Sequence, residues 1–449
     1  MNLSNAIDER DFWEVESTYV IGHQRPDTDA VAAALGYAWY LTATGAENTT
    51  AARAGQLAAQ TSFALARFGC PPPILLNGVA PLFAHIAEPQ KALTADAPLS
   101  EAMAQLAQGR RVVPILDDDQ KPLGVVTAIA LARAYSALIH HPERAKEIEA
   151  QSCREVLEDS PHFRAKERIS DNRAALLRGA SDDFLVTDDA GHYLGVANRS
   201  QVVAPPRARL ILVDHNELGQ AITGANEAEI ISVLDHHRLG NAPTSNPIPF
   251  VVEPVGSTCT LIAERCRSAQ LNPPASIAGV LLSGILSDTL VFRSPTTTPR
   301  DREIAQWLAG LANVNTEDYG NELLRVTPGL MARTIEDIVD SDRKSYEMAG
   351  HKVSIGQVEI TNLQELPQRR DDLLSGLEER RQREGLALIG LMVTDVVTGT
   401  SHLLGSGEPP LLRALPFHRL SEGEWGLDSI VSRKKQLIPA LSDAVESAF

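Results

Sequence analysis

Short apolar runs recur along the chain, and the polar positions that follow them are often aspartate or histidine. Four of these runs are interpreted as strands, at 17–21, 209–213, 229–234 and 283–286. Segments of helix length separate the runs, and the first of them, 30–42, follows Asp29, which stands at the position of a helix cap. Buried strands that alternate with helices predict an α/β fold with a mostly parallel sheet.

Two proline-rich breaks divide the chain, at 71–73 and at 205–206. Between them the sequence repeats weakly at a spacing of 71 residues, because the acidic turn before 123–124 resembles the acidic turn before 194–195. Each copy predicts a strand, a turn, a strand and a helix, with another helix before them. The segment between the breaks is therefore predicted to be a pair of small β-α-β-β-α units.

These breaks, together with a weaker pattern at 315–328, divide the chain into four segments, of which the first and third form one domain. The predicted boundaries are 1–72, 73–205 (the insert), 206–325 and 326–449. In the last segment the runs at 352–360 and 386–394 predict strands, so we expect a second α/β domain there.

The charge of the chain limits its partners. The 41 lysines and arginines stand against 58 aspartates and glutamates, and the formal net charge of −17 argues against wrapping DNA or RNA. No apolar stretch reaches the roughly 20 residues of a membrane span, and residues 1–17 lack the pattern of a secretion signal. The four cysteines are scattered, without a C-x-x-C pair. We therefore expect a cytoplasmic protein with no membrane or nucleic-acid partner.

Histidine and aspartate side chains follow the predicted strands, at the edge where parallel sheets bind ligands. Each of them alone is typical of a turn or a helix cap. Together they bring nitrogen and oxygen donors to one edge, where the carboxylates would repel one another unless cations lay among them. The six candidates are His23, Asp27, Asp29, Asp214, His236 and Asp288.

Imidazole and carboxylate donors without thiolates suit manganese, cobalt, magnesium or zinc. Because six donors exceed one tetrahedral site, two ions that share a bridging carboxylate are the economical interpretation. Such a pair lowers the pKa of a bridging water and holds a phosphoryl group for in-line attack. The sequence contains neither a G-x-S-x-G nucleophile motif nor a P-loop, so we expect metal-assisted hydrolysis.

Four motifs resemble those of the DHH phosphoesterase superfamily, in the same order. They lie at 22–29, 214–216, 235–237 and 287–289. The basic tail 432–436 resembles that of the family II, or manganese-type, inorganic pyrophosphatases, as do 342–344 and 355–359. This resemblance implies a parallel-sheet DHH domain that the insert interrupts, followed by a C-terminal DHH-associated α/β domain that binds substrate.

The resemblance further implies hydrolysis of inorganic pyrophosphate by a water that two metal ions activate. The ions would be Mn²⁺ or Co²⁺, two in each active site, with Mg²⁺ accompanying the substrate. One ion would lie between His23 and Asp27, and Asp214 would bridge to the other. The second ion would have the remaining ligands, Asp29, His236 and Asp288.

Substrate contacts also follow from the resemblance. His237 would bind the pyrophosphate and take part in proton transfer. Lys344, Arg433 and Lys434 would close over it from the C-terminal domain, since arginine offers a bidentate fork and lysine a compact charge. Together with Asp214, these four are the predicted catalytic residues.

The insert resembles a pair of CBS domains, in which adenine nucleotides bind between the repeats and modulate activity. Those modules contact the ribose through a Gly-h-h-Ser/Thr-x-x-Asp pattern, where h is apolar. Here Ala130 replaces the acid in the first copy, and Asn198 and Gln201 replace the hydroxyl and the acid in the second. Two interpretations stay open, a module that binds AMP, ADP or ATP and a structural or dimerising module, and the pair suggests a homodimer.

Two alternative functions remain at this point. A polyphosphate-cleaving phosphohydrolase of the same superfamily would share most of the motifs, and the chain length of the substrate would separate the two. A catalytically silent nucleotide-sensing CBS protein would keep the fold without needing an intact ligand set. A nuclease of the superfamily would carry a glycine-rich G-G-G-H signature, which this sequence lacks.

Overall fold

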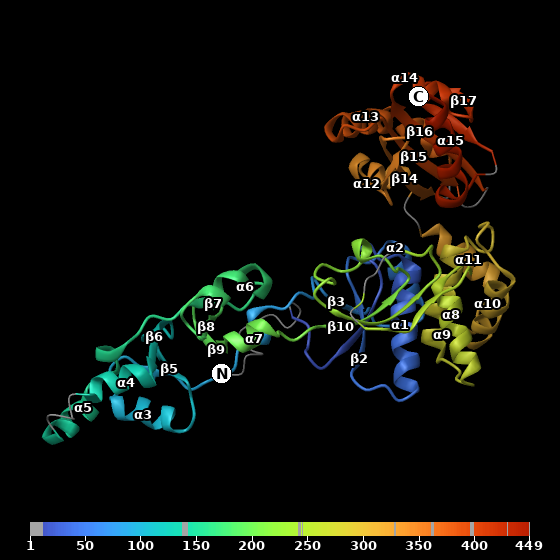
Figure 1. The fold of residues 1–449 in the computed structure, drawn as a ribbon. Helices are drawn as coiled ribbons and strands as arrows, with labels where there is room; N and C mark the ends of the chain where they lie inside the picture. Colours follow the sequence, from blue (N-terminus) through green and yellow to red (C-terminus); the bar gives the residue numbers. More distant parts are fainter. Residues whose placement is uncertain are drawn as a thin grey trace.

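The structure is a computed structural model that describes residues 12–136, 142–240, 244, 246–326, 329–360, 363–395, 399–428 and 430–448. Residues 1–11 and 449, at the outer ends of the predicted domains, and 327–328, at the end of the predicted link, lie outside the described residues. Figure 1 shows three parts: a sheet domain, an insert (cyan to green) that extends away from it, and a C-terminal domain (orange to red).

The sheet domain is built on six parallel strands in the order β12-β11-β10-β1-β2-β3. The strands are β1 (Thr18–Ile21), β2 (Thr49–Arg53), β3 (Ile74–Leu75), β10 (Arg209–Val213), β11 (Glu229–Asp235) and β12 (Phe250–Val252). The insert leaves after β3, and the chain returns as β10 directly beside β1. The predicted parallel sheet is therefore confirmed, and two segments far apart in sequence form its centre.

Helices of this domain lie against the sheet and beside it (Figure 1). They are α1 (Thr28–Ala43), α2 (Ala59–Arg67), α8 (Thr258–Ser268), α9 (Ala275–Asp288), α10 (Pro299–Ala312) and α11 (Thr316–Arg325). The alanine-rich α1 packs closely against α9, and a Cβ at Gly36 would lie 2.4 Å from the Leu281 side chain. Small residues on α1 thus let the helix that ends in Asp288 approach the helix that carries Asp29.

Three sequence expectations are wrong in detail. The run at 283–286 is part of α9 and not a strand, because a continuous apolar run fits a buried helix as well as a buried strand. Asp27, and not Asp29, is the cap of α1, since its carboxylate accepts from the Ala30 amide. The segment expected to link the domains contains α11, which Asn315 caps.

The insert contains two units of the same order, each with a three-stranded sheet. The first comprises β4 (Leu93–Thr94), α3 (Leu99–Ala107), β5 (Val112–Leu116), β6 (Pro122–Thr127) and α4 (Ala128–Tyr135), with α5 (Ala145–Ala150) after it. The second comprises β7 (His162–Arg164), α6 (Ile169–Arg178), β8 (Asp183–Thr187), β9 (Tyr193–Asn198) and α7 (Arg199–Val203). The predicted repeat is therefore present as a structural repeat. Each unit has its own core, and the two meet through Val112, Val125, Leu185 and Val196.

The C-terminal domain has a mixed six-stranded sheet in the order β13-β14-β15-β16-β18-β17. Its strands are β13 (Lys344–Met348), β14 (His351–Ile360), β15 (Leu388–Asp395), β16 (Thr400–Gly407), β17 (His418–Ser421) and β18 (Glu424–Leu427). Its helices are α12 (Ile335–Val339), α13 (Leu366–Glu384), α14 (Pro409–Ala414), α15 (Ile438–Ala448) and a π-helical turn, Arg433–Leu437. Two apolar cores lie within the domain, and both predicted strands are confirmed.

Within the described ranges, every helix is too short or too polar to cross a bilayer.

Candidate metal centre

The candidate ligands gather at the carboxyl edge of the parallel sheet. His23 and Asp27 lie in the loop after β1, Asp214 follows β10, and His236 follows β11. Asp288 reaches the same place from the last turn of α9. The parallel direction of the strands brings these loops together although up to about 265 residues separate them in sequence.

Two groups of donor atoms that contain the predicted ligands share one carboxylate, and a third group joins that carboxylate and His236 to His237. His23, Asp27 and Asp214 form the first group, and the second contains Asp29, Asp214, His236 and Asp288, with the atoms of each group within 4.8 Å of one another. His23 Nε2 lies 3.6 Å from Asp214 Oδ2, whereas His236 Nε2 lies 3.4 Å from Asp214 Oδ1. The two oxygens of Asp214 therefore face different groups, as a bridging carboxylate requires. All six predicted ligands are brought together.

The histidine rings are oriented so that ligating nitrogens remain available. His236 Nδ1 donates to the Val255 carbonyl at 3.0 Å, which orients the ring so that Nε2 is the nitrogen that a cation would bind in place of a proton. That Nε2, and Asp214 Oδ2, are buried without a hydrogen-bond partner. Buried polar atoms are normally satisfied. Two such atoms aimed into one acidic cluster fit divalent cations with nitrogen and oxygen ligands.

The electrostatics of the cluster indicate a shortage of positive charge. Burial, together with the nearby Asp214 carboxylate, raises the pKa of Asp29 to about 7. Burial, followed by Asp29 and Asp27, raises the pKa of Asp288 well above its usual range. Burial lowers the pKa of His236, but the Asp214 carboxylate outweighs it and raises the pKa to about 9. Carboxylates and imidazoles that retain protons in this way are a site for cations, which replace those protons.

Asp29 is held by a cradle that the sequence reasoning missed. Its carboxylate accepts from Ser257 Oγ at 2.6 Å, from the Thr258 amide at 2.7 Å and from the Cys259 amide at 3.1 Å. Thr258 Oγ1 also donates to Asp214 at 3.0 Å. The sequence contains one signal for this cradle. The Gly-Ser-Thr segment at 256–258, which follows a strand and begins α8, is typical of a helix N-cap.

A second carboxylate, that of Asp301, holds the loop that forms this cradle. Asp301 is fully buried and accepts from the Gly256 amide, at 2.9 and 3.0 Å to its two oxygens, and from Thr260 Oγ1 at 2.6 Å. It also caps α10 through Thr298. The loop that holds Asp29 is therefore fixed on both sides, because Asp301 bonds to the residues before and after Ser257 and Thr258.

His237 lies at the rim of the cluster. Its Nδ1 donates to Asp235 Oδ1 at 2.8 Å, and Asn216 Nδ2 donates to the other oxygen of Asp235. Asp235 therefore orients the ring and leaves Nε2 available, although the sequence analysis did not single it out as a site residue. The side chain of His237 is 37% exposed, enough to meet a ligand in the cleft.

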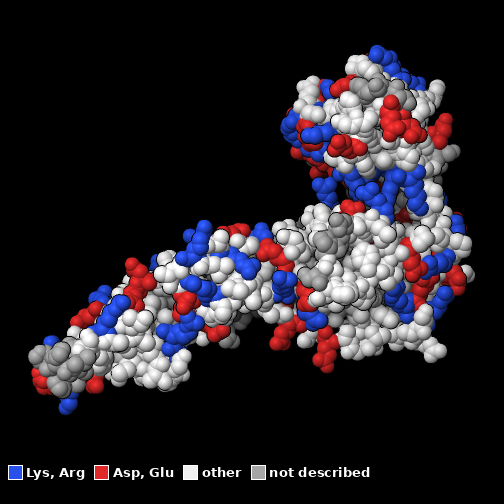
Figure 2. Space-filling view, viewed as in Figure 1, with Lys and Arg blue, Asp and Glu red and all other residues white. Residues whose placement is uncertain are grey.

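The predicted cations lie on the C-terminal domain, opposite the cluster. Figure 2 shows lysine and arginine side chains gathered on the face of this domain that is turned toward the sheet domain. Burial lowers the pKa of Lys434, and the neighbouring Lys344 lowers it further, while Asp235 of the sheet domain raises it. Lys344 and Lys434 therefore lie together, near the motif at 235–237. Arg433 differs, because it is 5% exposed and bonded to Asp342.

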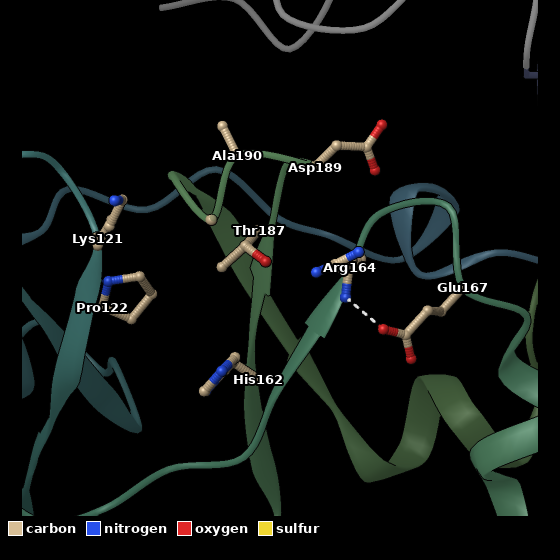
Figure 3. Close-up of a pocket in the computed structure, with 9 residues that line it drawn as sticks. Lys121, Pro122, His162, Arg164, Glu167, Thr187, Asp189 and Ala190 are labelled. Carbon is tan, nitrogen blue, oxygen red and sulfur yellow. Dashed lines mark hydrogen bonds between the residues drawn. The ribbon is translucent and has the colours of Figure 1, made fainter.

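The insert has a hollow of its own, about 450 Å³ in volume (Figure 3). It lies between the β5–β6 hairpin of the first unit and the sheet of the second. Cationic or titratable side chains from both units line it together with two carboxylates: Lys121, His162, Arg164, Glu167 and Asp189. The Arg164 amide donates to Glu167 at 3.2 Å.

Known proteins resemble the chain over both the sheet domain and the C-terminal domain. The family model described as "DHH family, N-terminal domain" matches residues 17–285, and the "DHHA2 domain" model matches residues 321–444. A "Cobalt-dependent inorganic pyrophosphatase" of Clostridium perfringens is 31% identical over 278 residues, which cover 62% of this chain and only 51%, about half, of that protein. A "Probable manganese-dependent inorganic pyrophosphatase" of Lactobacillus delbrueckii subsp. bulgaricus is 36% identical over 250 residues, 55% of this chain and 80% of that protein.

A solved structure extends the likeness across the insert as well. The crystal structure of a Methanococcus jannaschii protein assigned to the family II inorganic pyrophosphatases aligns with a TM-score of 0.58 and 25% identity. The alignment covers 96% of this chain and 99% of that one. The sheet topology, the shared aspartate and these matches lead to one assignment: the chain belongs to the DHH family, and within it to the family II inorganic pyrophosphatases.

Proposed function

We propose that the protein hydrolyses inorganic pyrophosphate to two phosphates. The observation that carries this proposal is the position of Asp214, fully buried between two groups of donors, with one oxygen toward each. Relatives whose names give this activity, with manganese or cobalt, agree with it. A carboxylate shared in this way is what two-metal phosphoryl hydrolysis requires.

Each residue has a distinct part in this proposal. His23, Asp27 and Asp214 would hold one ion, and Asp214 would also join the second group. That second group adds Asp29, His236 and Asp288. Bound there, Mn²⁺ or Co²⁺ would lower the pKa of a water and polarise a phosphoryl group, while Mg²⁺ would accompany the substrate.

The residues around the cluster would orient the substrate and move protons. His237, which Asp235 orients, presents Nε2 to the cleft, where it would bind the pyrophosphate and transfer a proton. Lys344 and Lys434 would neutralise phosphate oxygens from the C-terminal domain, whose basic face is turned toward the sheet domain in Figure 2. Arg433, the third predicted substrate cation, is buried and bonded to Asp342, so we assign the direct phosphate contacts to the two lysines. Because these cations and the cluster belong to different domains, substrate would draw the two domains together.

The direct test is phosphate release from pyrophosphate by metal-stripped protein after Mn²⁺, Co²⁺ or Mg²⁺ is restored. We expect turnover with Mn²⁺ or Co²⁺. A parallel assay with tripolyphosphate distinguishes the alternative function, because a polyphosphate-cleaving enzyme would prefer this longer substrate to pyrophosphate. A protein that binds Mn²⁺ but releases no phosphate from either substrate would contradict the proposal and favour a catalytically silent sensor.

We also propose that the insert is a CBS pair with a regulatory role, and that its response to AMP, ADP or ATP is weak. The hollow between its units brings Lys121, His162 and Arg164 together, a composition that suits a phosphate group. The positions that would contact the ribose, in the Gly-h-h-Ser/Thr-x-x-Asp pattern, are less favourable for nucleotide binding. Thr127 Oγ1 already donates to Glu158 at 2.7 Å, and Gln201 Nε2 donates to Glu88 at 2.7 Å.

These two glutamates make the regulatory proposal testable. Carboxylates beside both ribose positions repel nucleotide phosphates, so calorimetry should detect only weak binding of AMP and ATP. Glu158→Gln should strengthen that binding, and Glu155→Gln, a nearby exposed change, serves as the control. Tight, stoichiometric binding of either nucleotide to the unchanged protein would overturn the proposal.

We also propose that the protein is a homodimer in the cytoplasm. The four cysteines are buried and free, which agrees with a reducing compartment. The insert exposes apolar side chains on helices of both units, namely Met103, Ile129, Leu177 and Val203. Sedimentation of the full chain should give twice the mass of 48.5 kDa.

A further inference from the structure

Arg433 is fixed within the C-terminal domain by groups from two other segments. It opens the π-helical turn Arg433–Leu437, and only 5% of its surface is exposed. Its Nη1 donates to the carbonyl oxygens of Asp342 and of Ile355, the latter at 3.3 Å. Its Nη2 lies 2.8 Å from Asp342 Oδ2. Asp342 therefore contacts both terminal nitrogens of one guanidinium, through its main chain and its side chain.

Asp342 itself has an unusual backbone. Its φ angle is +38°, in the left-handed region that residues other than glycine rarely adopt. Such a conformation persists where the surroundings hold it, often at functional sites. At Asp342 the turn directs the carbonyl oxygen and the carboxylate to the same arginine. The residue lies two positions before Lys344, the first residue of β13.

The contact between Arg433 and Asp342 joins the two segments that carry the lysines of the cleft. Lys434 directly follows Arg433, and Lys344 follows Asp342 by two positions. The two ammonium groups repel each other, since Lys344 lowers the pKa of Lys434. Without a link between their segments, this repulsion and the freedom of two long side chains would separate them.

We propose that Asp342 is a positioning residue for pyrophosphate binding, which acts through Arg433 to hold Lys344 and Lys434 together as one cationic face. This inference rests on the proposed function, which assigns pyrophosphate to that face. It adds a residue whose negative charge would by itself repel the substrate.

Another role for the same carboxylate would be to compete with the substrate for Arg433. The geometry favours positioning over competition. The guanidinium is buried and is bonded to two carbonyl oxygens as well as to the carboxylate, so loss of the carboxylate would loosen Arg433 without presenting it to the cleft. The two roles predict opposite changes in KM.

The test is Asp342→Asn in the Mn²⁺-loaded full chain. Positioning predicts a KM for pyrophosphate about tenfold higher, with kcat changed by less than about threefold, because binding loses its pre-organisation while the metal cluster is untouched. The number of Mn²⁺ ions bound should not change. Asp371→Asn is the matched control, since Asp371 is also an arginine-paired aspartate of this domain, 87% exposed, and pairs with Arg370. A lower KM in Asp342→Asn would overturn the proposal in favour of competition, and an unchanged KM would overturn it outright.

A double variant tests whether Asp342 acts through Arg433. If it does, Asp342→Asn should add almost nothing to the effect of Arg433→Lys, and additive effects would contradict the proposal. Calorimetry with methylenediphosphonate, a diphosphate that is not hydrolysed, keeps this result separate from the catalytic proposal. If the unchanged protein does not hydrolyse pyrophosphate, the proposed function is refuted. If the unchanged protein and Asp342→Asn bind methylenediphosphonate equally well, the role of Asp342 is refuted.

Discussion

At the scale of single residues, the metal centre depends on side chains that each contact two partners. Asp214 faces both histidines, and its φ of +62° lies in the left-handed region, a strained conformation that its neighbours hold. Asp27 combines two roles, as the cap of α1 through Oδ1 and as the partner of His23 through Oδ2. Substitution of such a residue removes more than one interaction.

Asp214→Asn should lower kcat by two to three orders of magnitude, because the amide cannot supply two anionic oxygens to neighbouring ions. Phosphate release measures the loss, and the Mn²⁺ bound per chain should fall in parallel. Asp118→Asn, at an exposed turn position of the insert, is the control. Turnover close to that of the unchanged protein would exclude a bridging role for Asp214.

Ser257→Ala should weaken Mn²⁺ binding by about tenfold while the fold is retained, because the hydroxyl that orients Asp29 is lost. Titration of metal-stripped protein with Mn²⁺ gives the affinity directly. Ser375→Ala, on the exposed side of α13, provides the comparison. If both variants bind Mn²⁺ equally well, the cradle does not contribute to the metal site.

At the scale of elements, the N-terminal segment fastens the insert to the sheet domain. Trp13 donates from Nε1 to the Ala80 carbonyl at 3.3 Å and stacks on His85, with ring centroids 4.1 Å apart. His85 Nδ1 accepts from the Leu82 amide at 2.9 Å. Burial lowers the pKa of His85 to about 4, so the ring is neutral at this junction.

This junction should lose stability in mild acid. Because the folded pKa of His85, about 4, lies below its ordinary value, the unfolded chain takes up a proton first as the pH falls. The contribution of the neutral ring is present above about pH 6.5 and is lost between there and pH 4, by about 3 kcal/mol. His85→Phe keeps the stacking and removes the titration, so the stability of this variant should improve relative to the unchanged protein as the pH falls.

Denaturant unfolding at pH 5 and pH 8, followed by the fluorescence of tryptophan, measures this difference. His418→Phe, at an exposed histidine of β17, is the matched control. A stability difference between the His85 variant and the unchanged protein that is independent of pH would contradict the assignment.

At the scale of the whole molecule, the insert and the sheet domain have separate cores. The cores of the insert draw only on residues 83–202, whereas those of the sheet domain draw on residues before 80 and after 207. All metal-ligand candidates belong to the sheet domain, and the cations predicted to bind substrate belong to the C-terminal domain.

Replacement of residues 82–203 by a flexible Gly-Ser linker should therefore leave kcat within about threefold of the full chain, because a domain with its own core folds without its neighbour. The same deletion should abolish any response to AMP, ADP or ATP. Phosphate release with and without nucleotide measures both. Loss of Mn²⁺ binding in the shortened chain would show that the sheet domain needs the insert to fold.

The parallel sheet, the structural repeat and a set of six candidate ligands that gather at one place could all be predicted from residue order. These follow from local patterns: apolar runs, acidic turns and motifs whose residues are neighbours in the chain. Residue order could not determine that Asp288 lies on a helix, because a buried helix and a buried strand have the same continuous apolar pattern.

The residues that support the ligands could be identified only from the packing of the folded chain. Ser257 and Thr258 reach Asp29 across more than 200 residues of sequence, and Arg433 is paired with Asp342 instead of pointing freely into the cleft. Such contacts depend on how strands and helices pack, and residue order does not reveal them. The chemistry of the centre can therefore be predicted from the motifs, whereas its orientation and its charge balance arise from the fold.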